Sequence, residues 1–275
     1  MMLALNVGNT HISLSVKEKG EGNIMNLPCS KTKEHFDSIS ITLMLKKTLS
    51  TSQLDSISVV LVASVVPALN KEIQKAFRKL MNLTPLFIQT AALDQLGFDY
   101  SKYDTAILGI DRLIASYYTK NGCLLPAIVI DFGTATTFNI LDEKGAFIGG
   151  VIVPGIFLWI RSLSNNAALL PDNIELCETS SVVGTSTSEC ISIGVLHGMG
   201  ILVDGFIKKF EQQVGATFKS VVATGGGAEY IMPYCEAITM INKDLVLMGL
   251  FSIYEDLCLS GMASNSFTED QEEVI

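Results

Sequence analysis

Apolar and polar positions alternate with two different periods along the chain, and the changes of period predict alternating strands and helices. Residues 3–6 and 11–16 flank a Gly-Asn-Thr turn and have the pattern of a hairpin with a buried first strand. Residues 94–105 show little periodicity and are expected to form a surface connection. Three helices are predicted, over 37–49, 69–80 and 110–118, and three further strands, over 56–63, 85–89 and 125–131.

The pattern of the first hairpin recurs at mid-chain. Residues 3–10 (LALNVGNT) align with residues 128–135 (IVIDFGTA), so that Asn6 meets Asp131 and Gly8 meets Gly133. Further strands and helices are expected over 147–153, 220–223 and 245–258 and from Pro154 and Cys190. The repeat predicts two lobes of similar plan, over 1–122 and 123–262, followed by a polar acidic tail over 263–275.

Length and composition fit this organisation. A chain of 275 residues is near the upper limit for one hydrophobic core, so the length alone allows one large domain or two lobes. With 48% hydrophobic and 17% charged residues, a compact fold is expected. The longest apolar run, 146–160, is shorter than the roughly 18–20 residues of a membrane span, and Pro154 interrupts it. We expect a buried strand followed by a core helix there, and no membrane partner.

The net charge and the spacing of the cysteines argue against a nucleic-acid-binding protein and against a cysteine metal site. The formal net charge is −9 and the chain has only three arginines, so nucleic acid is not an expected partner. The six cysteines form no CxxC pair and are expected to be reduced thiols. The first residues contain no basic leader, which favours a cytoplasmic protein.

The first candidate site is the turn of the opening hairpin, Asn6-Val-Gly-Asn-Thr10. A glycine at the end of a buried strand lets backbone N–H groups approach a phosphate closely. Taken alone, a Gly-Asn turn is more often an ordinary hairpin. Its recurrence as Asp131-Phe-Gly-Thr134 favours two turns that face one cleft and hold a triphosphate with magnesium, for which Asp131 supplies a carboxylate.

The second candidate site is a run of three glycines, Gly225, Gly226 and Gly227, directly after the predicted strand 220–223. Such a run can be a flexible link. At a strand end in an α/β protein, however, glycines commonly make room for a nucleotide, and we favour that interpretation.

The third candidate site, Gly109-Ile-Asp-Arg112, places a carboxylate and an arginine at the start of an apolar helix. Asp111 can simply stabilise the helix N-terminus, where negative charge is favoured. Alternatively, Asp111 accepts the proton of a substrate hydroxyl and Arg112 binds an anionic group of the substrate with two hydrogen bonds. The residues alone leave both roles open.

Taken in order, these segments resemble the type III pantothenate kinases, which belong to the acetate kinase, sugar kinase, heat-shock 70 and actin superfamily. The resemblance spans nearly the whole chain and implies an α/β fold of two ribonuclease H-like lobes with a nucleotide cleft between them. It also implies a homodimer with the pantothenate pocket at the subunit interface. Six motifs carry it: NVGNT (6–10), GIDR (109–112), DFGTATT (131–137), GGVIVPG (149–155), GTST (184–187) with Glu189, and TGGGA (224–228).

The implied activity is the ATP-dependent phosphorylation of pantothenate, the first step of coenzyme A biosynthesis, with Mg²⁺ and a monovalent cation (K⁺ or NH₄⁺). By resemblance, Asp111 matches the catalytic base and Asp131 the ligand of the monovalent cation. The expected pantothenate contacts are Gly109, Ile110, Asp111, Arg112, Thr187 and Tyr103. The expected ATP contacts are Thr134, the glycines 225–227 and a first phosphate loop formed by Asn6, Val7, Gly8, Asn9, Thr10, His11, Ile12 and Ser13.

The chain departs from the family pattern in two places. Asn6 stands where the family has an aspartate that helps to place the magnesium nucleotide, and an amide oxygen attracts a dication less strongly. Around Tyr103, the sequence Tyr-Asp-Thr-Ala lacks the family's asparagine-proline-like segment. Two other interpretations therefore stay open: a catalytically weak or inactive relative that acts as a regulator or binding protein, and a kinase for another small anionic substrate.

Overall fold

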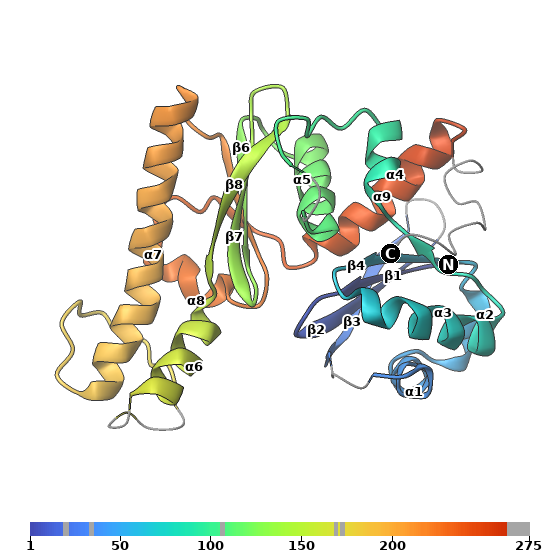
Figure 1. Cartoon of the computed structure of the whole chain (residues 1–275), viewed down its shortest axis with the longest axis horizontal. Coiled ribbons are helices and arrows are strands. Elements are labelled where there is room, and N and C mark those ends of the chain that lie inside the picture. Colours follow the sequence, from blue (N-terminus) through green and yellow to red (C-terminus); the bar gives the residue numbers. More distant parts are fainter. Residues whose placement is uncertain (19–21, 33–35, 105–107, 168–169, 171–173, 263–275) are drawn as a thin grey trace. The chain divides into compact units, whose positions relative to one another are not determined.

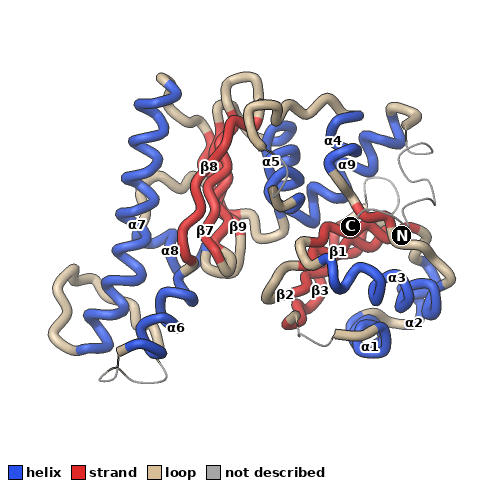
Figure 2. The backbone as a smooth tube through the Cα atoms, viewed as in Figure 1, coloured by secondary structure: helices blue, strands red, loops and turns tan. Residues whose placement is uncertain are grey.

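The computed structural model of the chain describes residues 1–18, 22–32, 36–104, 108–167, 170 and 174–262. Within these residues, two five-stranded sheets form the framework, and helices lie against both (Figures 1 and 2). The sheets belong to two compact units. Of the described residues, unit 1 contains Met1–Asp99, Asp104–Tyr118 and the segment from Asp244, and unit 2 contains Tyr100–Tyr103 and Thr119–Lys243. The tail over 263–275 and Thr105, at the end of the expected surface connection, lie outside the described residues.

The sheet of unit 1 has the order β3-β2-β1-β4-β5. The central strand β1 pairs antiparallel with β2 and parallel with β4. Its alternate residues Leu3, Leu5 and Val7 face a core that α1 and α3 complete, while α9 packs on β1 and β4 (Figure 1). The strands are β1 (Met2–Val7), β2 (His11–Lys17), β3 (Ile24–Lys31), β4 (Val59–Ser64) and β5 (Leu86–Phe87), and the helices are α1 (Ser38–Thr48), α2 (Thr51–Ser56), α3 (Pro67–Met81), α4 (Thr90–Gln95), α9 (Leu245–Leu259) and α5 (Ile110–Gly122), whose residues from Thr119 belong to unit 2.

Unit 2 repeats this plan. Its order, β10-β9-β6-β7-β8, is that of unit 1 read from the other end, with β6 antiparallel to β7 and parallel to β9. The equivalent strands β1 and β6 also share one burial pattern, in which the residue before the last, Asn6 or Asp131, is the partly exposed one. The α/β fold with two similar lobes is therefore confirmed. The elements are β6 (Ala127–Phe132), β7 (Ala135–Leu141), β8 (Phe147–Pro154), β9 (Ser220–Thr224), β10 (Met240–Ile241), α6 (Ile156–Asn166), α7 (Thr187–Val214), α8 (Ala228–Ile231) and a 3₁₀ turn (Met232–Tyr234).

The edge strand β3 has no counterpart among the sequence predictions. Pro28 lies within it, and proline is confined to edge strands and irregular positions because it has no N–H to donate. The register of β3 with β2 shifts between Ile12 and Leu14, next to this proline. The short helices α2 and α4 were also not expected, and α4 occupies the beginning of the supposed surface connection.

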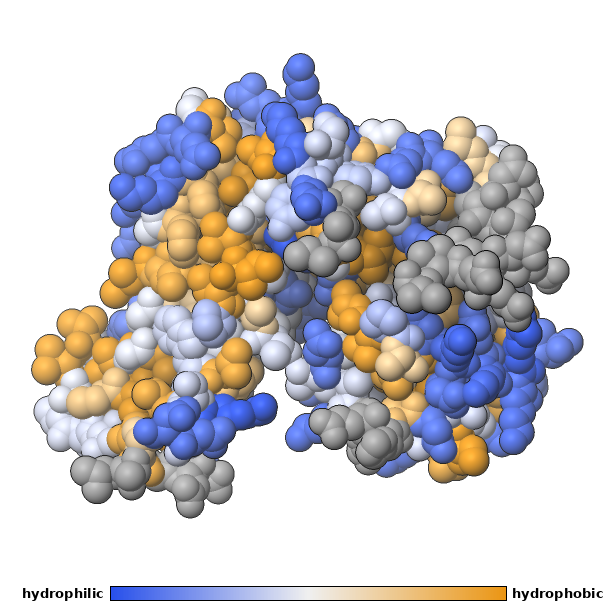
Figure 3. All heavy atoms as spheres, viewed as in Figure 1, coloured by the Kyte–Doolittle hydropathy of each residue, from blue (hydrophilic) through white to orange (hydrophobic). Residues whose placement is uncertain are grey.

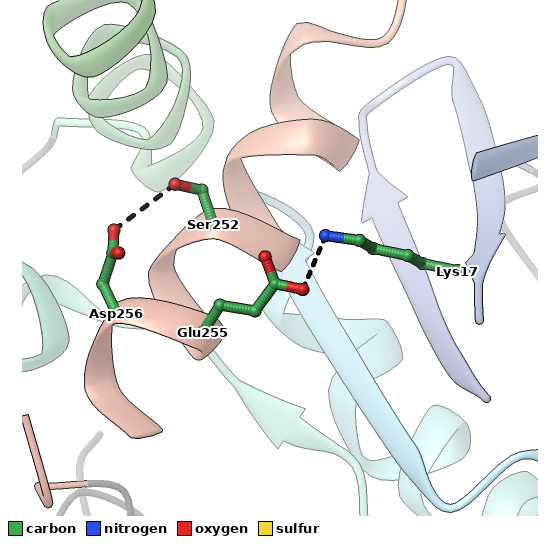
Figure 4. A network of polar contacts seen from close by, with 4 residues as sticks. All are labelled: Lys17, Ser252, Glu255 and Asp256. Carbon is green, nitrogen blue, oxygen red and sulfur yellow. Dashed lines mark hydrogen bonds and ion pairs between the residues drawn. The ribbon is translucent and has the colours of Figure 1, made fainter. Parts of the chain in front are cut away.

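Helix α9 follows unit 2 in sequence but packs in unit 1, whereas the sequence placed residues 245–258 in the second lobe. Two polar contacts accompany its buried apolar side chains: Lys17 Nζ lies 2.5 Å from Glu255 Oε1, and the Tyr117 hydroxyl donates to Asp256 Oδ2 at 2.7 Å. Figure 4 shows the first of these and the hydrogen bond from Ser252 to Asp256. The helix is apolar on most of its circumference, so its sequence pattern does not indicate which sheet it covers.

The expectation of a core helix after β8 was wrong for the single chain. Ile156 is the buried residue of α6, while Phe157 and Leu158 are 47% and 41% exposed. On β8, Ile152 is 58% exposed. Figure 3 shows apolar side chains gathered on the visible face of unit 2. Several apolar side chains of β8 and α6 are therefore exposed to solvent in the single chain.

In the part of the chain that the structure describes, α7 is the one helix long and apolar enough to cross a membrane by length and composition. The sequence analysis found no apolar run of that length, because polar residues interrupt the pattern. Nine residues of α7 are buried, and several of their side chains pack on Phe138 and its neighbours in unit 2. We interpret α7 as the core helix of this unit.

Candidate functional site

The first predicted phosphate loop is a tight turn between β1 and β2. The Gly8 N–H donates to the His11 carbonyl at 2.9 Å, and a Cβ on Gly8 would lie 3.2 Å from that oxygen, so glycine allows the close approach. The side chains of Asn9 and Thr10 are exposed. Asn6 pairs with Ser13 at the base of the turn, where buried Val7 and Ile12 fix the strand ends.

The start of α5 lies at the same edge of the unit 1 sheet. The residue after β4, Val65, donates its N–H to the Val7 carbonyl at 3.0 Å. A Cβ on Gly109 would lie 3.5 Å from Val65 Cγ1. Because β1 and β4 are parallel, their carboxyl ends meet here, and the structure brings the first turn and the segment Gly109–Arg112 together.

Two neighbouring residues fix the position of the Asp111 carboxylate. Its Oδ1 accepts a hydrogen bond of 2.8 Å from the Arg112 N–H, and a Cβ on Gly109 would lie only 2.5 Å from the same oxygen. Burial raises the pKa of Asp111 above its ordinary value of 3.8, against the smaller lowering effects of the Arg112 amide and charge. The carboxylate is therefore a stronger proton acceptor than an exposed aspartate.

The neighbouring Arg112 is 9% exposed, so its side chain lies largely inside unit 1. Asp111 is also in the first turn of α5, where a negative charge is favoured. The geometry thus fits both roles that the sequence left open for Asp111, and kinetics must separate them.

The second predicted turn joins β6 to β7 in unit 2, and the glycine run lies against it. A Cβ on Gly225 would lie 2.2 Å from Asp131 Oδ1, and the φ of Gly225 is +82°. The Gly227 N–H donates to the Phe132 carbonyl at 2.9 Å, while a Cβ on Gly226 would meet nothing within 4 Å. The glycine run therefore allows β9 to end against the Asp131 carboxylate and leaves open space at its middle residue.

Gly155 closes the second turn, a role that the sequence analysis did not assign. Its N–H donates to the Thr134 carbonyl at 3.0 Å, and a Cβ would lie 2.3 Å from the Gly133 carbonyl oxygen. The signal in the sequence is a glycine directly before the helix that starts at Ile156. Thr134 itself has an exposed side chain, as a ligand contact requires.

Thr187 is the first residue of α7, and Glu189 of the same helix holds the loop that precedes it. Glu189 Oε2 accepts from the Thr185 N–H at 2.8 Å and from the Thr185 hydroxyl at 2.9 Å, and these bonds lower the pKa of Glu189. The loop lines a cavity of about 920 Å³, whose other walls include Trp159 and Leu163 of α6. The cavity combines apolar walls with hydroxyl groups, as small-molecule sites commonly do.

Tyr103 packs on β8 in unit 2. Its ring meets Phe147 edge to face, with centroids 5.5 Å apart, and a Cβ on Gly149 would lie 3.8 Å from Tyr103 Cδ2. The predicted residues thus form separate groups within each unit. Asn6 and Asp131 belong to different units, so their meeting across one cleft stays a prediction.

Within the described ranges, no group of three or more histidine, cysteine, aspartate or glutamate side chains could hold a metal ion. Asp131 supplies one carboxylate at the second turn, and Asn6 supplies an amide oxygen at the end of β1. Magnesium that accompanies a nucleotide keeps several waters and takes one or two protein carboxylates. Each turn by itself therefore offers one side-chain oxygen donor, which fits a metal that arrives with phosphates.

The sequence is similar to a known protein family over most of its length. The family model described as type III pantothenate kinase matches residues 2–209. A type III pantothenate kinase of Desulforapulum autotrophicum is 32% identical over 91% of this chain and 95% of its own length. One of Halalkalibacterium halodurans is 32% identical over 93% and 99%, and one of Zymomonas mobilis is 31% identical over 93% and 92%.

Solved structures show the same fold at lower identity. A Baf family protein from Campylobacter jejuni, described as a transcriptional activator, has a TM-score of 0.56 at 20% identity and covers 94% of this chain and 99% of its own. The ethanolamine utilization protein EutJ from Carboxydothermus hydrogenoformans has a TM-score of 0.50 at 14% identity, with 91% and 88% covered. At these identities the likeness concerns the fold alone.

Proposed function

This chain belongs to the type III pantothenate kinase family, and from that membership we propose that it transfers the γ-phosphate of ATP to the hydroxyl group of pantothenate. The product is 4'-phosphopantothenate, and the reaction is the first step of coenzyme A biosynthesis. The relatives quoted above share this name at 31–32% identity over nearly the whole chain. A regulator without activity and a kinase for another small anion are not favoured.

The observation that carries the proposed mechanism is the position of Asp111 beside the first turn in unit 1. In this mechanism the substrate hydroxyl gives its proton to the Asp111 carboxylate while its oxygen bonds to the γ-phosphorus, and the bond from that phosphorus to ADP breaks. A raised pKa suits this task, because a stronger base takes the proton more readily near neutral pH.

We propose that both turns bind the same nucleotide. The loop from Asn6 to Ser13 offers backbone N–H groups to the phosphates, and Gly226, whose surroundings are open, lets a nucleotide approach β9 closely. Thr134 offers an exposed hydroxyl to ATP. The pantothenate contacts are proposed at Gly109, Ile110, Asp111, Arg112, Thr187 and Tyr103, of which Thr187 lines the cavity beside α6.

A magnesium ion would neutralise phosphate charge, and a monovalent cation, K⁺ or NH₄⁺, would do the same near Asp131. Asp131 is the proposed protein ligand, since its carboxylate lies at the end of β6 against Gly225. The protein's own part is to hold this carboxylate still, which the close packing of the glycine run supports.

Changing Asn6 to aspartate is expected to strengthen binding of the magnesium nucleotide. A unit charge about 4 Å from a cation is worth about 1 kcal/mol in water and about 4 kcal/mol near a protein surface, so the affinity should rise roughly fivefold or more. Asn6 is partly exposed, so the new charge is not forced into the core. Titration of the nucleotide with and without Mg²⁺ measures the effect. A gain of equal size without Mg²⁺ would remove Asn6 from the metal site.

One assay tests the proposed function. Purified protein is incubated with ATP, Mg²⁺, K⁺ and pantothenate, and phosphopantothenate is measured against a reaction without protein. Formation of the product supports the proposal. ATP turnover that is independent of pantothenate would point to another acceptor, and nucleotide binding without turnover would favour the regulator.

We also propose a cytoplasmic homodimer, with no nucleic acid or membrane partner. Phe157, Leu158 and Leu163 of α6 are 47%, 41% and 38% exposed, and a second copy would remove them from water. Sedimentation at micromolar concentration should show a dimer, and Phe157→Asp should shift it toward monomer. Leu124→Asp is the control, because this leucine is 69% exposed but lies outside α6. A monomeric parent protein would contradict the proposal.

A further inference from the structure

Thr32 holds the first turn from outside, although no motif of the sequence includes it. It follows β3, the edge strand next to β2. Its hydroxyl donates to the Gly8 carbonyl at 2.8 Å, and its backbone N–H donates to the Thr10 carbonyl at 2.8 Å. One residue therefore fixes carbonyl groups on both sides of Asn9.

These two hydrogen bonds determine how the turn presents its amide groups. A trans peptide holds its C=O and the following N–H on opposite sides of the chain. Because the Gly8 carbonyl is directed at Thr32, the N–H of Asn9 is directed away from Thr32. The Gly8 N–H is engaged separately, with the His11 carbonyl at 2.9 Å. The orientation of the Asn9 amide thus depends on the Thr32 side chain.

We propose that Thr32 is a positioning residue for nucleotide binding, whose hydroxyl orients the Gly8–Asn9 peptide so that the Asn9 N–H binds a phosphate oxygen. This inference rests on the proposed function, since it takes the first turn as a phosphate loop. Glycine has more accessible backbone conformations than other residues. Without the Thr32 hydroxyl, the Gly8–Asn9 peptide should therefore adopt other orientations as well. Fixing the peptide before binding avoids that loss of affinity.

The alternative is that the hydroxyl only secures the end of β3. A structural role of that kind would lower the melting temperature without changing nucleotide affinity at temperatures where the protein is folded. The backbone bond from Thr32 to Thr10 remains in any side-chain variant, so the strand end keeps one of its two attachments.

Three variants separate these roles. Thr32→Val keeps the shape and removes the donor, and Thr32→Ser keeps the donor. Thr48→Val is the matched control, because Thr48 is also half-buried in unit 1 and its hydroxyl donates to a carbonyl, that of Met44, at 2.7 Å. We measure the Kd of ADP and of ATP by titration calorimetry, the KM for ATP and for pantothenate, kcat, and the melting temperature.

Thr32→Val is expected to raise the Kd and KM of the nucleotide about 3–10-fold, the effect of losing one hydrogen bond, while the KM for pantothenate stays close to the parent's. Thr32→Ser should restore nucleotide affinity, and Thr48→Val should leave it unchanged. Equal nucleotide affinity in Thr32→Val and Thr32→Ser would overturn the inference. A parent protein that binds nucleotide but does not phosphorylate pantothenate would overturn the proposed function instead, because the Kd series still decides the role of Thr32.

Discussion

Replacing Asp111 by asparagine is expected to lower kcat by about 10²–10⁴-fold, the usual contribution of a general base. The amide keeps the shape of the carboxylate and can still accept from the Arg112 N–H, but it cannot take the proton of the hydroxyl. Nucleotide affinity should stay close to the parent's, because Asp111 is not among the phosphate contacts. Steady-state kinetics with ATP and pantothenate measure the change.

A matched control distinguishes catalysis from helix capping. Asp37 caps α1 in the same unit, where its Oδ1 accepts from the Ser40 N–H at 2.8 Å. Asparagine caps a helix about as well as aspartate, so Asp37→Asn should leave turnover intact. If Asp111 were only a cap, Asp111→Asn would behave in the same way as Asp37→Asn, and the proposed mechanism would lose its base.

The raised pKa of Asp111 also sets the sign of the pH effects. Since the pKa of Asp111 in the folded state exceeds the ordinary 3.8, the folded protein binds a proton at Asp111 more tightly than the unfolded chain does. The free energy of unfolding therefore falls as the pH rises from the ordinary pKa through the folded-state pKa. Asp111→Asn should therefore melt at the same or a higher temperature than the parent at neutral pH. In the parent, the acid limb of kcat/KM should lie above the ordinary aspartate range.

Replacing Gly225 by alanine is expected to disrupt unit 2 and to abolish nucleotide binding. A Cβ there would lie 2.2 Å from Asp131 Oδ1 and 2.8 Å from the Phe132 carbonyl carbon, at a φ of +82°. Backbone strain and overpacking each cost about 1–3 kcal/mol, so the melting temperature should fall roughly 5–20 °C. Differential scanning calorimetry and a nucleotide titration follow the two effects.

The neighbouring Gly226 supplies the comparison. A Cβ on Gly226 would meet nothing within 4 Å, so Gly226→Ala should melt close to the parent. If the nucleotide occupies that open space, Gly226→Ala should still weaken ATP binding. Unchanged affinity in a folded Gly226→Ala protein would show that the nucleotide does not approach β9 at this point.

The repeat made much of the fold predictable. Residues 3–10 and 128–135 align without gaps, and the structure gives each segment a strand, a tight turn and an antiparallel partner strand, with Val7 paired to Ile12 and Phe132 to Thr136, so that the second turn is one residue shorter. Short-range periodicity is enough for this, because each copy buries alternate residues on one sheet face. The lobe of α9 was not predictable in the same way, since a helix that is apolar on most sides can cover either sheet.

The sequence predicted those parts of the candidate site in which a charged side chain is the functional group. It did not predict the residues that hold the backbone of the two turns. Asp111 and Asp131 carry charge in short motifs, so the sequence exposes them directly. Thr32 and Gly155 act on carbonyl groups of turns that lie far away along the chain. The hydrophobic pattern around such a residue indicates the strand or helix that contains it. It does not indicate which distant turn the residue contacts.

The placement of α9 has a consequence for the order in which a ribosome releases the chain. Unit 1 contains the first strand to be synthesised, but Leu250, Phe251 and Ile253 of its core come from the last described helix. Apart from Tyr100–Tyr103, unit 2 is a single stretch, Thr119–Lys243, that leaves the ribosome earlier. We expect unit 2 to complete its fold first, while the nascent unit 1 presents an uncovered sheet face to chaperones until Leu259 has emerged.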